Sequence, residues 1–225
     1  LPAIVGACKA AADKLIEYAG NPGAPMADAE ADDLVYEAGV VKNGKGDQAT
    51  PAEILEPQKL PHAVGDFHSD GSPADGYAYG SFGVNFVEIG WNPNTAQLKV
   101  RRVVSSIDAG AIMNDATARS QVEGAIVMGL GAAMFEATEY DERTGRPVNN
   151  NYAEYLVPVN ADMPELDVIL LNHPDYHLNE LGARGIGEIG LTGVQAAVAN
   201  AVYHATGKRI RDLPITLDKI MDETA

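Results

Sequence analysis

Two β-rich runs separated by a short polar turn restrict the fold of this sequence more than any other feature. The runs cover residues 79–91 and 97–108, and Asn92-Pro93-Asn94-Thr95 lies between them. Within the first run, large apolar residues alternate with their neighbours: Phe82, Val84 and Phe86 with Gly83, Asn85 and Val87. Such alternation on either side of a turn signal predicts a β-hairpin.

Five helices are predicted from apolar spacing and from capping signals. Residues 3–19, 116–134 and 192–205 carry apolar side chains at the three- and four-residue spacing of one helix face. A capping box with proline at the first helical position predicts a short helix that ends at about Gln58. Residues 217–221 are predicted to form a last short turn of helix.

The remaining pattern favours the α+β class. Further strands are predicted over 34–41, 135–141 and 166–172, and residues 42–46 read as the turn after the first of them. Residues 60–77 are rich in Gly, Pro, Asp and His and predict a long loop, which is usually functional or mobile. Helices follow strands irregularly and no internal repeat is present, so α+β is favoured over a doubly wound sheet.

Composition excludes several kinds of partner. The chain has 32 Asp and Glu against 16 Lys and Arg, a formal net charge of −16, so it lacks the basic face that nucleic acids require and repels anionic membranes. Cys8 is the single cysteine and cannot form an intrachain disulfide or a multi-thiolate metal site. We find neither an apolar run of about 18 residues nor a signal-peptide pattern, so no membrane insertion is predicted. The chain begins with Leu1 and not methionine, which suggests a piece of something longer.

The densest candidate site is a glycine-rich run over residues 182–190 that leads into the last long helix. Such a loop offers unpaired backbone N–H groups and the positive end of a helix dipole, which suit a phosphate or another anion. The spacing Gly185-x-Gly187-x-x-Gly190 matches the dinucleotide-binding fingerprint literally, but no strand is predicted directly before it and no βαβ unit follows. A purely structural loop is the stronger alternative.

Glu188 distinguishes this run from an ordinary turn, because it stands among glycines and apolar residues. A carboxylate with few polar neighbours can serve as a general base near neutral pH. The alternative is an ordinary glutamate in the first turn of a helix, favoured by the helix dipole. Spacing alone slightly favours that alternative.

A second polar constellation lies at residues 114–124. Asp115 is a plausible N-cap, and Arg119 and Gln121 fall in the first two turns, where a planar amide can pair with a heterocycle. Solvated first-turn polar residues are the common alternative. The glycines of this helix, Gly124, Gly129 and Gly131, predict close packing of another backbone or a ligand. A zinc site at His173 and His177 is disfavoured because Pro174 argues against a helix there.

Several of these segments together resemble the molybdenum-binding large subunit of the xanthine dehydrogenase and aldehyde oxidase family. The resemblance is carried by Gly185-Ile186-Gly187-Glu188, residues 200–214, Gln121-Val122-Glu123-Gly124 and residues 81–88. It covers residues 79–221 well and residues 1–60 loosely. The nearest subgroup is the bacterial aldehyde oxidoreductases that use molybdopterin cytosine dinucleotide.

The resemblance implies that residues 1–225 are the C-terminal part of that family's molybdenum-cofactor-binding domain. It implies that Glu188 is the catalytic base in the oxidative hydroxylation of an aldehyde to a carboxylic acid, or of an N-heterocycle, with water as the oxygen source. It also implies contacts to the pterin dinucleotide from Ala111, Ile112, Met113, Asn114, Asp115, Ala116, Thr117, Gln121, Arg184, Gly185, Ile186 and Gly187. No protein ligand to molybdenum is expected, because sulfur atoms of the cofactor hold the metal.

The resemblance further implies partners for this chain. These are the N-terminal remainder of the large subunit, an iron–sulfur subunit with 2Fe-2S clusters, an FAD subunit and a small-molecule substrate, in the bacterial cytoplasm or periplasm. The family's large subunit is several times longer, so we expect a fragment of it or a split subunit. The alternative is a non-catalytic assembly or interaction module derived from the same family.

Overall fold

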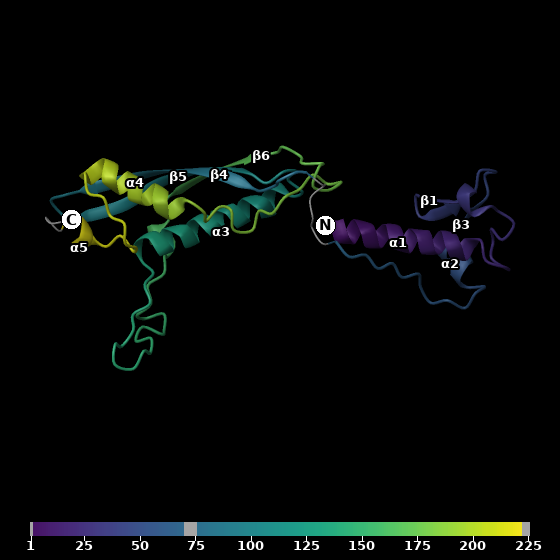
Figure 1. Cartoon of the computed structure of the whole chain (residues 1–225), viewed down its shortest axis with the longest axis horizontal. Coiled ribbons are helices and arrows are strands. Elements are labelled where there is room, and N and C mark those ends of the chain that lie inside the picture. Colours follow the sequence, from purple (N-terminus) through teal and green to yellow (C-terminus); the bar gives the residue numbers. More distant parts are fainter. Residues whose placement is uncertain (1, 70–75, 222–225) are drawn as a thin grey trace. The chain divides into compact units, whose positions relative to one another are not determined.

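The structure is a computed structural model that describes residues 2–69 and 76–221. The chain divides into two compact units, Leu1–Ser72 and Pro73–Ala225, each with its own hydrophobic core (Figure 1). The loop expected over 60–77 lies partly outside the described residues, and its described part contains no helix or strand. None of the described helices combines the length and the apolar character needed to cross a bilayer.

The first unit combines helices with a small antiparallel sheet. In chain order its elements are α1 (Pro2–Ala19), the 3-10 helix η1 (Ala31–Asp33), β1 (Val35–Glu37), β2 (Val40–Lys42), β3 (Gln48–Ala49) and α2 (Pro51–Leu55). α1 confirms the helix predicted over 3–19, and its residues Leu15 and Ala19 are buried with Val41 and Ile54. α2 begins at the predicted capping box but ends before Gln58.

The strand predicted over 34–41 is wrong in its extent, because the chain reverses within it. β1 and β2 pair antiparallel, with Val35 opposite Lys42. The reversal occurs at Ala38 and Gly39, whose φ angles are 52° and 85°. Positive φ at two successive residues gives the tight turn that joins neighbouring antiparallel strands, so one predicted strand is a short hairpin.

The second unit is a three-stranded sheet with helices on one face. Its elements are β4 (Phe82–Asn92), β5 (Gln97–Asp108), α3 (Asp115–Met134), the 3-10 helix η2 (Asn160–Asp162), β6 (Glu165–Leu171), α4 (Val194–Thr206) and α5 (Leu217–Met221). The order in the sheet is β4-β5-β6, with β4 antiparallel and β6 parallel to β5. The predicted hairpin, the three helices of this unit and the strand over 166–172 are thereby confirmed, each to within a few residues.

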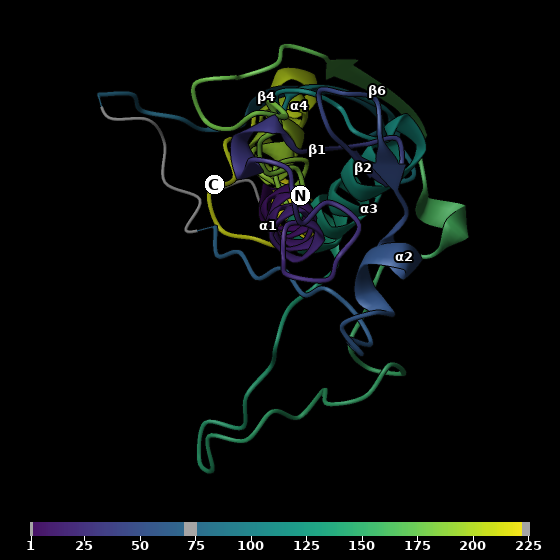
Figure 2. The same cartoon turned by 90° about the vertical axis from the view of Figure 1, so that its right-hand side faces the viewer.

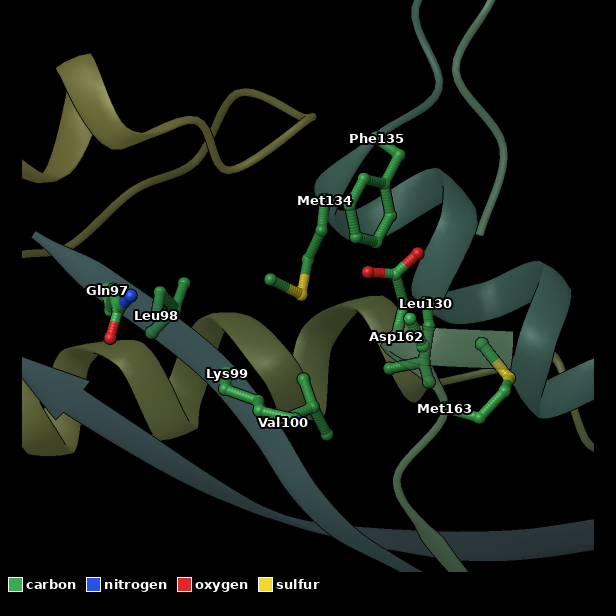
Figure 3. A pocket seen from close by; sticks show the side chains of 10 residues that line it. Gln97, Leu98, Lys99, Val100, Leu130, Met134, Phe135, Asp162 and Met163 are labelled. Atoms are coloured by element: carbon green, nitrogen blue, oxygen red, sulfur yellow. The ribbon is translucent and has the colours of Figure 1, made fainter. Parts of the chain in front are cut away.

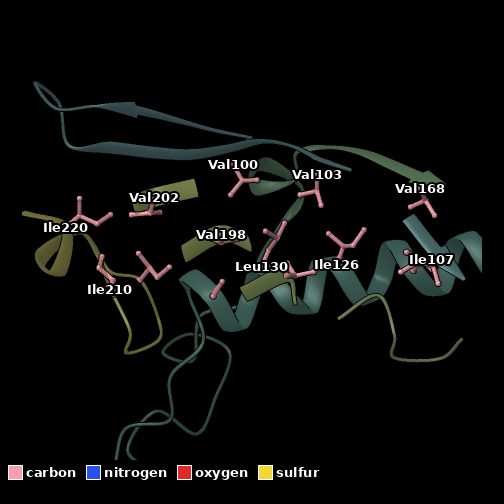
Figure 4. Close-up of a cluster of buried hydrophobic side chains, with 14 of the residues drawn as sticks. Val100, Val103, Ile107, Ile126, Leu130, Val168, Val198, Val202, Ile210 and Ile220 are labelled. Atoms are coloured by element: carbon pink, nitrogen blue, oxygen red, sulfur yellow. The ribbon is translucent and has the colours of Figure 1, made fainter. Parts of the chain in front are cut away.

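A continuous apolar core lies between the sheet and the helices α3 and α4 (Figure 4). β5 contributes Val103 and Ile107, and α3 contributes Ile126, all of them fully buried. Val198 from α4 and Val168 from β6 complete the same layer. Since α3 connects β5 to the parallel strand β6, the end of β5 is placed next to the start of α3.

The strand predicted over 135–141 does not form. Residues 135–159 instead make a loop that extends away from the end of α3, as both Figure 1 and Figure 2 show, with one isolated bridge between Tyr140 and Pro147. Two backbone hydrogen bonds, from Asp141 to Arg146 and from Val148 to Glu139, are all that pair residues 135–141 with 146–148. The amide side chain of buried Asn149 binds the backbone next to them. It accepts from the N–H of Glu139 at 3.0 Å and donates to the carbonyl of Ala137 at 2.7 Å.

Candidate functional site

The end of β5 and the glycine-rich run before α4 are joined directly by backbone hydrogen bonds. The N–H of Ala111 donates to the carbonyl of Gly182 at 2.7 Å, and the N–H of Arg184 donates to the carbonyl of Ala109 at 2.8 Å. Gly110 lies between these bonds with a φ of 72°, and a Cβ there would stand 2.2 Å from the Gly182 oxygen. Two segments far apart in the sequence, 109–112 and 182–184, therefore form one joined structure.

A cluster of ionisable side chains centred on buried Asp108 reinforces this junction, with Arg184 nearly buried and His173 exposed. Oδ1 of Asp108 accepts from the N–H of Gly110 at 3.0 Å and from Nη2 of Arg184, while Oδ2 lies 2.9 Å from Nδ1 of His173. Nη1 of Arg184 donates to Oδ2 of Asp175 at 2.9 Å. Burial raises the pKa of Asp108, but the Gly110 hydrogen bond, His173 and the charge of Arg184 outweigh burial and hold the pKa below its ordinary value.

The first turn of α3 leads out of the same junction. Asn114 is the N-cap, with extended backbone and a side-chain oxygen that accepts from the N–H of Thr117 at 3.0 Å. The prediction that Asp115 is the N-cap is therefore wrong: it is the first helical residue, and its carboxylate lies 3.6 Å from Arg119. A second contact holds this segment, since the N–H of Ile112 donates to the side chain of Asn172 at 3.0 Å.

Four exposed residues of α3 follow each other at the spacing of one helix face: Thr117, Gln121, Gly124 and Met128. The glycines of α3 are predicted to pack against another backbone or a ligand, but at two of them the close neighbours are side chains. A Cβ on Gly129 would stand 2.6 Å from Val194 of α4, and one on Gly131 would stand 1.9 Å from the carboxylate of Glu136. A Cβ on Gly124 would meet nothing within 4 Å, so this helix face is open beside Gln121.

The run that contains Glu188 rests on α3 next to this open face. A Cβ on Gly190 would stand 3.0 Å from the carbonyl oxygen of Val122, the neighbour of Gln121. On the other side, β4 and the residue before it hold the run, because Ser81 donates to the carbonyl of Gly185 and Asn85 of β4 donates to that of Thr192. The run is thus fixed on two sides.

Glu188 lies in a turn and not in a helix. Its carbonyl accepts from the N–H of Leu191 at 3.0 Å, and α4 begins only at Val194, after Gly193 at its N-cap position. Because this separation exceeds one helical turn, the alternative that Glu188 is a first-turn helix glutamate is wrong. The side chain is exposed.

The glycines of this run leave free space where a ligand would need it. A Cβ on Gly185 or Gly187 would meet nothing within 4 Å. Within the described part of the chain, the N–H groups of residues 185–187 donate to no protein acceptor. Strand β6 ends at Leu171 and irregular structure follows it, which agrees with the rejection of the dinucleotide-binding fingerprint.

Each predicted cofactor residue has a defined place. Ala111 and Ile112 are half-buried at the junction, and Met113 through Thr117 are exposed around the start of α3. Gln121 is exposed on the open face, and Gly185 and Gly187 are exposed in the adjoining run. Ile186 between them is half-buried and packs against the core. The side chain of Arg184 differs from the rest, since it is 11% exposed and pairs with two carboxylates.

Sequence reasoning missed Asp108 and Asp175, the two carboxylate partners of Arg184, and His173, which contacts Asp108. The available signal was the lone carboxylate at the end of a predicted strand, directly before a glycine turn. The two histidines weighed as a pair do not converge, because His173 bonds to Asp108 and the ring of His177 stacks on Tyr77 with centroids 4.3 Å apart.

A separate cavity of about 300 Å³ lies at the other end of α3 (Figure 3). It is lined by Gln97, Leu98, Lys99, Val100, Leu130, Met134, Phe135, Ala161, Asp162 and Met163. No residue predicted for cofactor binding or catalysis is among them.

Comparison with known proteins finds a matching family model and relatives that are subunits of oxidoreductases. Residues 1–164 match the model of the molybdopterin cofactor-binding domain. The chain is 50% identical over 147 residues to the aldehyde oxidoreductase molybdenum-binding subunit PaoC of Escherichia coli strain K12, a match that covers 65% of this chain and 20% of that protein. It is 32% identical over 223 residues to the 6-hydroxypseudooxynicotine dehydrogenase complex subunit gamma of Paenarthrobacter nicotinovorans, covering 96% of this chain and 28% of that subunit.

Solved structures share the fold. The CO dehydrogenase from Oligotropha carboxidovorans superposes with a TM-score of 0.71 at 21% identity, over 95% of this chain and 27% of the other. The aldehyde oxidoreductase from Desulfovibrio desulfuricans superposes with a TM-score of 0.68 at 24% identity, over 98% of this chain and 22% of the other. The chain thus spans between a fifth and a third of the length of these relatives.

Proposed function

Because the chain belongs to the molybdopterin cofactor-binding domain family, we propose that it is part of the large subunit of a molybdenum hydroxylase. The observation that carries this proposal is the pairing of open glycines with an exposed carboxylate. Gly185 and Gly187 leave space for a ligand directly before Glu188, and the run rests on α3 beside Gln121 and Gly124.

The residues at this junction fit a dinucleotide cofactor. The N–H groups of residues 185–187 are available to donate to an anion, and glycines allow its close approach. The start of α3 adds the first-turn N–H groups that the Asn114 cap leaves unbonded, at the positive end of a long helix. In the proposed complex, residues 111–117 and 184–187 hold the pterin dinucleotide, and the Gln121 amide pairs with its polar edge.

Glu188 is assigned the role of general base. It is an exposed carboxylate in a turn held on both sides, by Gly190 against α3 and by Asn85 at Thr192. A positioned carboxylate of this kind takes up a proton as the water-derived oxygen attacks the electrophilic carbon of the substrate. The molybdenum cofactor, when bound, supplies the two-electron redox chemistry of the hydroxylation.

An aldehyde is the proposed substrate, and the product is the carboxylic acid. This choice is supported by the 50% identity to a subunit named aldehyde oxidoreductase, against 32% identity to a putative xanthine dehydrogenase subunit of Escherichia coli. From the sequence resemblance to the bacterial aldehyde oxidoreductases, we also propose molybdopterin cytosine dinucleotide as the cofactor form. The same resemblance is the basis for proposing a complex in which the rest of the large subunit, an iron–sulfur subunit with 2Fe-2S clusters and an FAD subunit complete the enzyme, in the bacterial cytoplasm or periplasm.

Turnover in water labelled with heavy oxygen tests this function. The natively purified complex that contains this chain is incubated with a panel of aromatic and aliphatic aldehydes and an artificial electron acceptor. We expect the label in the carboxylate of the product, detected by mass spectrometry, because water is the oxygen source. A product whose new oxygen atom carries no label would contradict the proposal, because water would then not be the source. An intact complex that converts no aldehyde and no N-heterocycle would also contradict it and would favour a non-catalytic assembly module.

A further inference from the structure

Asp108 is the only ionisable residue that is buried among those the structure describes. It stands at the last position of β5, directly before the segment that leads to the start of α3. Its main charged partner, Arg184, stands directly before Gly185 in the run that leads to Glu188. The buried pair therefore spans the two segments to which we assign the cofactor.

Stability is a weak explanation for such a pair. Removing two charges from water costs free energy, and apolar replacements of buried pairs are often neutral or stabilising. Here the cost is increased, because Nε of Arg184 is buried and has no hydrogen-bond partner among the described residues. What a buried pair provides is a single defined arrangement of the segments that carry it.

The geometry of Arg184 suits this role. Its planar guanidinium binds Asp108 through Nη2 and Asp175 through Nη1, so its rotation is fixed by two carboxylates from different segments. The backbone of the same residue donates to Ala109, and the N–H of Asp175 donates to Gly182 at 2.8 Å. Side chain and backbone thus hold residue 184 in one place, one residue before the open glycines.

We propose that Asp108 is a positioning residue that acts through Arg184 to fix residues 185–188 against residues 111–117. The consequence for catalysis rests on the function proposed above: the carboxylate of Glu188 is held at one distance from a cofactor bound by the first turn of α3. Asp108 itself touches neither the substrate nor the cofactor in this arrangement. Small displacements of a catalytic group cost large factors in rate, on the order of a hundredfold for about 1 Å.

Amide hydrogen exchange in the natively purified complex tests whether the Asp108–Arg184 pair fixes these segments. The test needs no measurement of enzyme activity. Asp108→Asn keeps the size of the side chain but leaves the Arg184 guanidinium facing a neutral amide. We expect the peptides that contain the N–H groups of Ala111 and Arg184 to exchange at least about tenfold faster, as loss of a charged hydrogen bond predicts, while α4 exchanges at its original rate. Asp167→Asn is the matched control, because Asp167 pairs with Arg102 at the exposed face of the same sheet, and it should leave both peptides unchanged.

Turnover divided by bound molybdenum gives the second readout. A positioning role predicts that Asp108→Asn lowers turnover per bound molybdenum by about tenfold or more. A merely structural role would lower the amount of folded enzyme but would leave turnover per bound molybdenum unchanged. If Asp108→Asn does not fold, Asp175→Asn applies the same two measurements to the other partner of Arg184, whose side chain is 20% exposed. Unchanged exchange at both peptides, or equal acceleration across the whole unit, would overturn the proposal.

The two proposals fail in different ways. Faster local exchange in Asp108→Asn, together with full activity in Glu188→Gln, would support the positioning role of Asp108 and exclude Glu188 as the base. Unchanged exchange in Asp108→Asn, together with an inactive Glu188→Gln, would exclude the positioning role of Asp108 and support Glu188 as the base.

Discussion

Replacing Glu188 by glutamine is expected to reduce turnover by about a thousandfold, within the range that general bases contribute. Glutamine has nearly the same size and can still donate and accept hydrogen bonds, but its amide cannot take up a proton. Because Glu188 is exposed and pairs with no charged group in the described residues, the change should leave folding and molybdenum content close to normal. The measurement is kcat for aldehyde oxidation, with metal analysis of the same preparation.

Glu142→Gln is the matched control for this experiment. Glu142 is also an exposed glutamate in a turn, but it lies in the loop over 135–159 that extends away from α3 (Figure 2). It should keep full turnover. A Glu188→Gln enzyme that retains its molybdenum and turns over at the original rate would remove Glu188 from the mechanism.

Replacing Gly187 by valine is expected to remove most of the cofactor while the protein itself stays folded. A Cβ at this position meets nothing within 4 Å of the protein, so the added methyl groups have room when no ligand is bound. They would occupy the space in which we place the dinucleotide, and close backbone approach to a phosphate needs glycine. The purified complex should therefore contain less than about a tenth of the original molybdenum, which corresponds to a loss of at least about 1.4 kcal/mol in binding.

Gly44→Val controls for the general effect of a branched side chain on an open glycine. Gly44 lies between β2 and β3 in the first unit, and a Cβ there also meets nothing within 4 Å. This variant should retain its molybdenum and its melting temperature. Full cofactor retention in Gly187→Val would show that residues 185–187 do not contact the dinucleotide.

Local patterns predict the elements of this fold well where the backbone hydrogen bonds form within one helix or between strands that follow each other in sequence. The hairpin of β4 and β5 follows from alternation on both sides of a turn, and α3 follows from apolar spacing. The hairpin inside 34–41 was missed because Ala38-Gly39 lacks the Asn-Gly or Asp-Gly signal that usually marks such a turn. The segment over 135–141 has strand-like residues, but it pairs with 146–148 through only two backbone hydrogen bonds, and the Asn149 amide bonds the backbone of Ala137 and Glu139.

The candidate site was predictable in its parts but not in its assembly. Glycine spacing identified the run around Glu188, and polar residues identified the start of α3. Their union depends on Asp108, which is separated from His173 by 65 residues and from Arg184 by 76. No local pattern encodes a contact over such a separation, whereas the sheet brings the end of β5 and the segment after β6 together because the two strands are parallel.

The molybdenum content of the natively purified protein, with every chain that copurifies, tests the central claim most directly. The account predicts a molybdenum atom for each copy of this chain, released together with a pterin dinucleotide, and iron and flavin in the copurifying subunits. An intact, folded assembly that contains this chain and holds no molybdenum would contradict the account and leave the junction of Asp108, Arg184 and Glu188 without the ligand proposed for it.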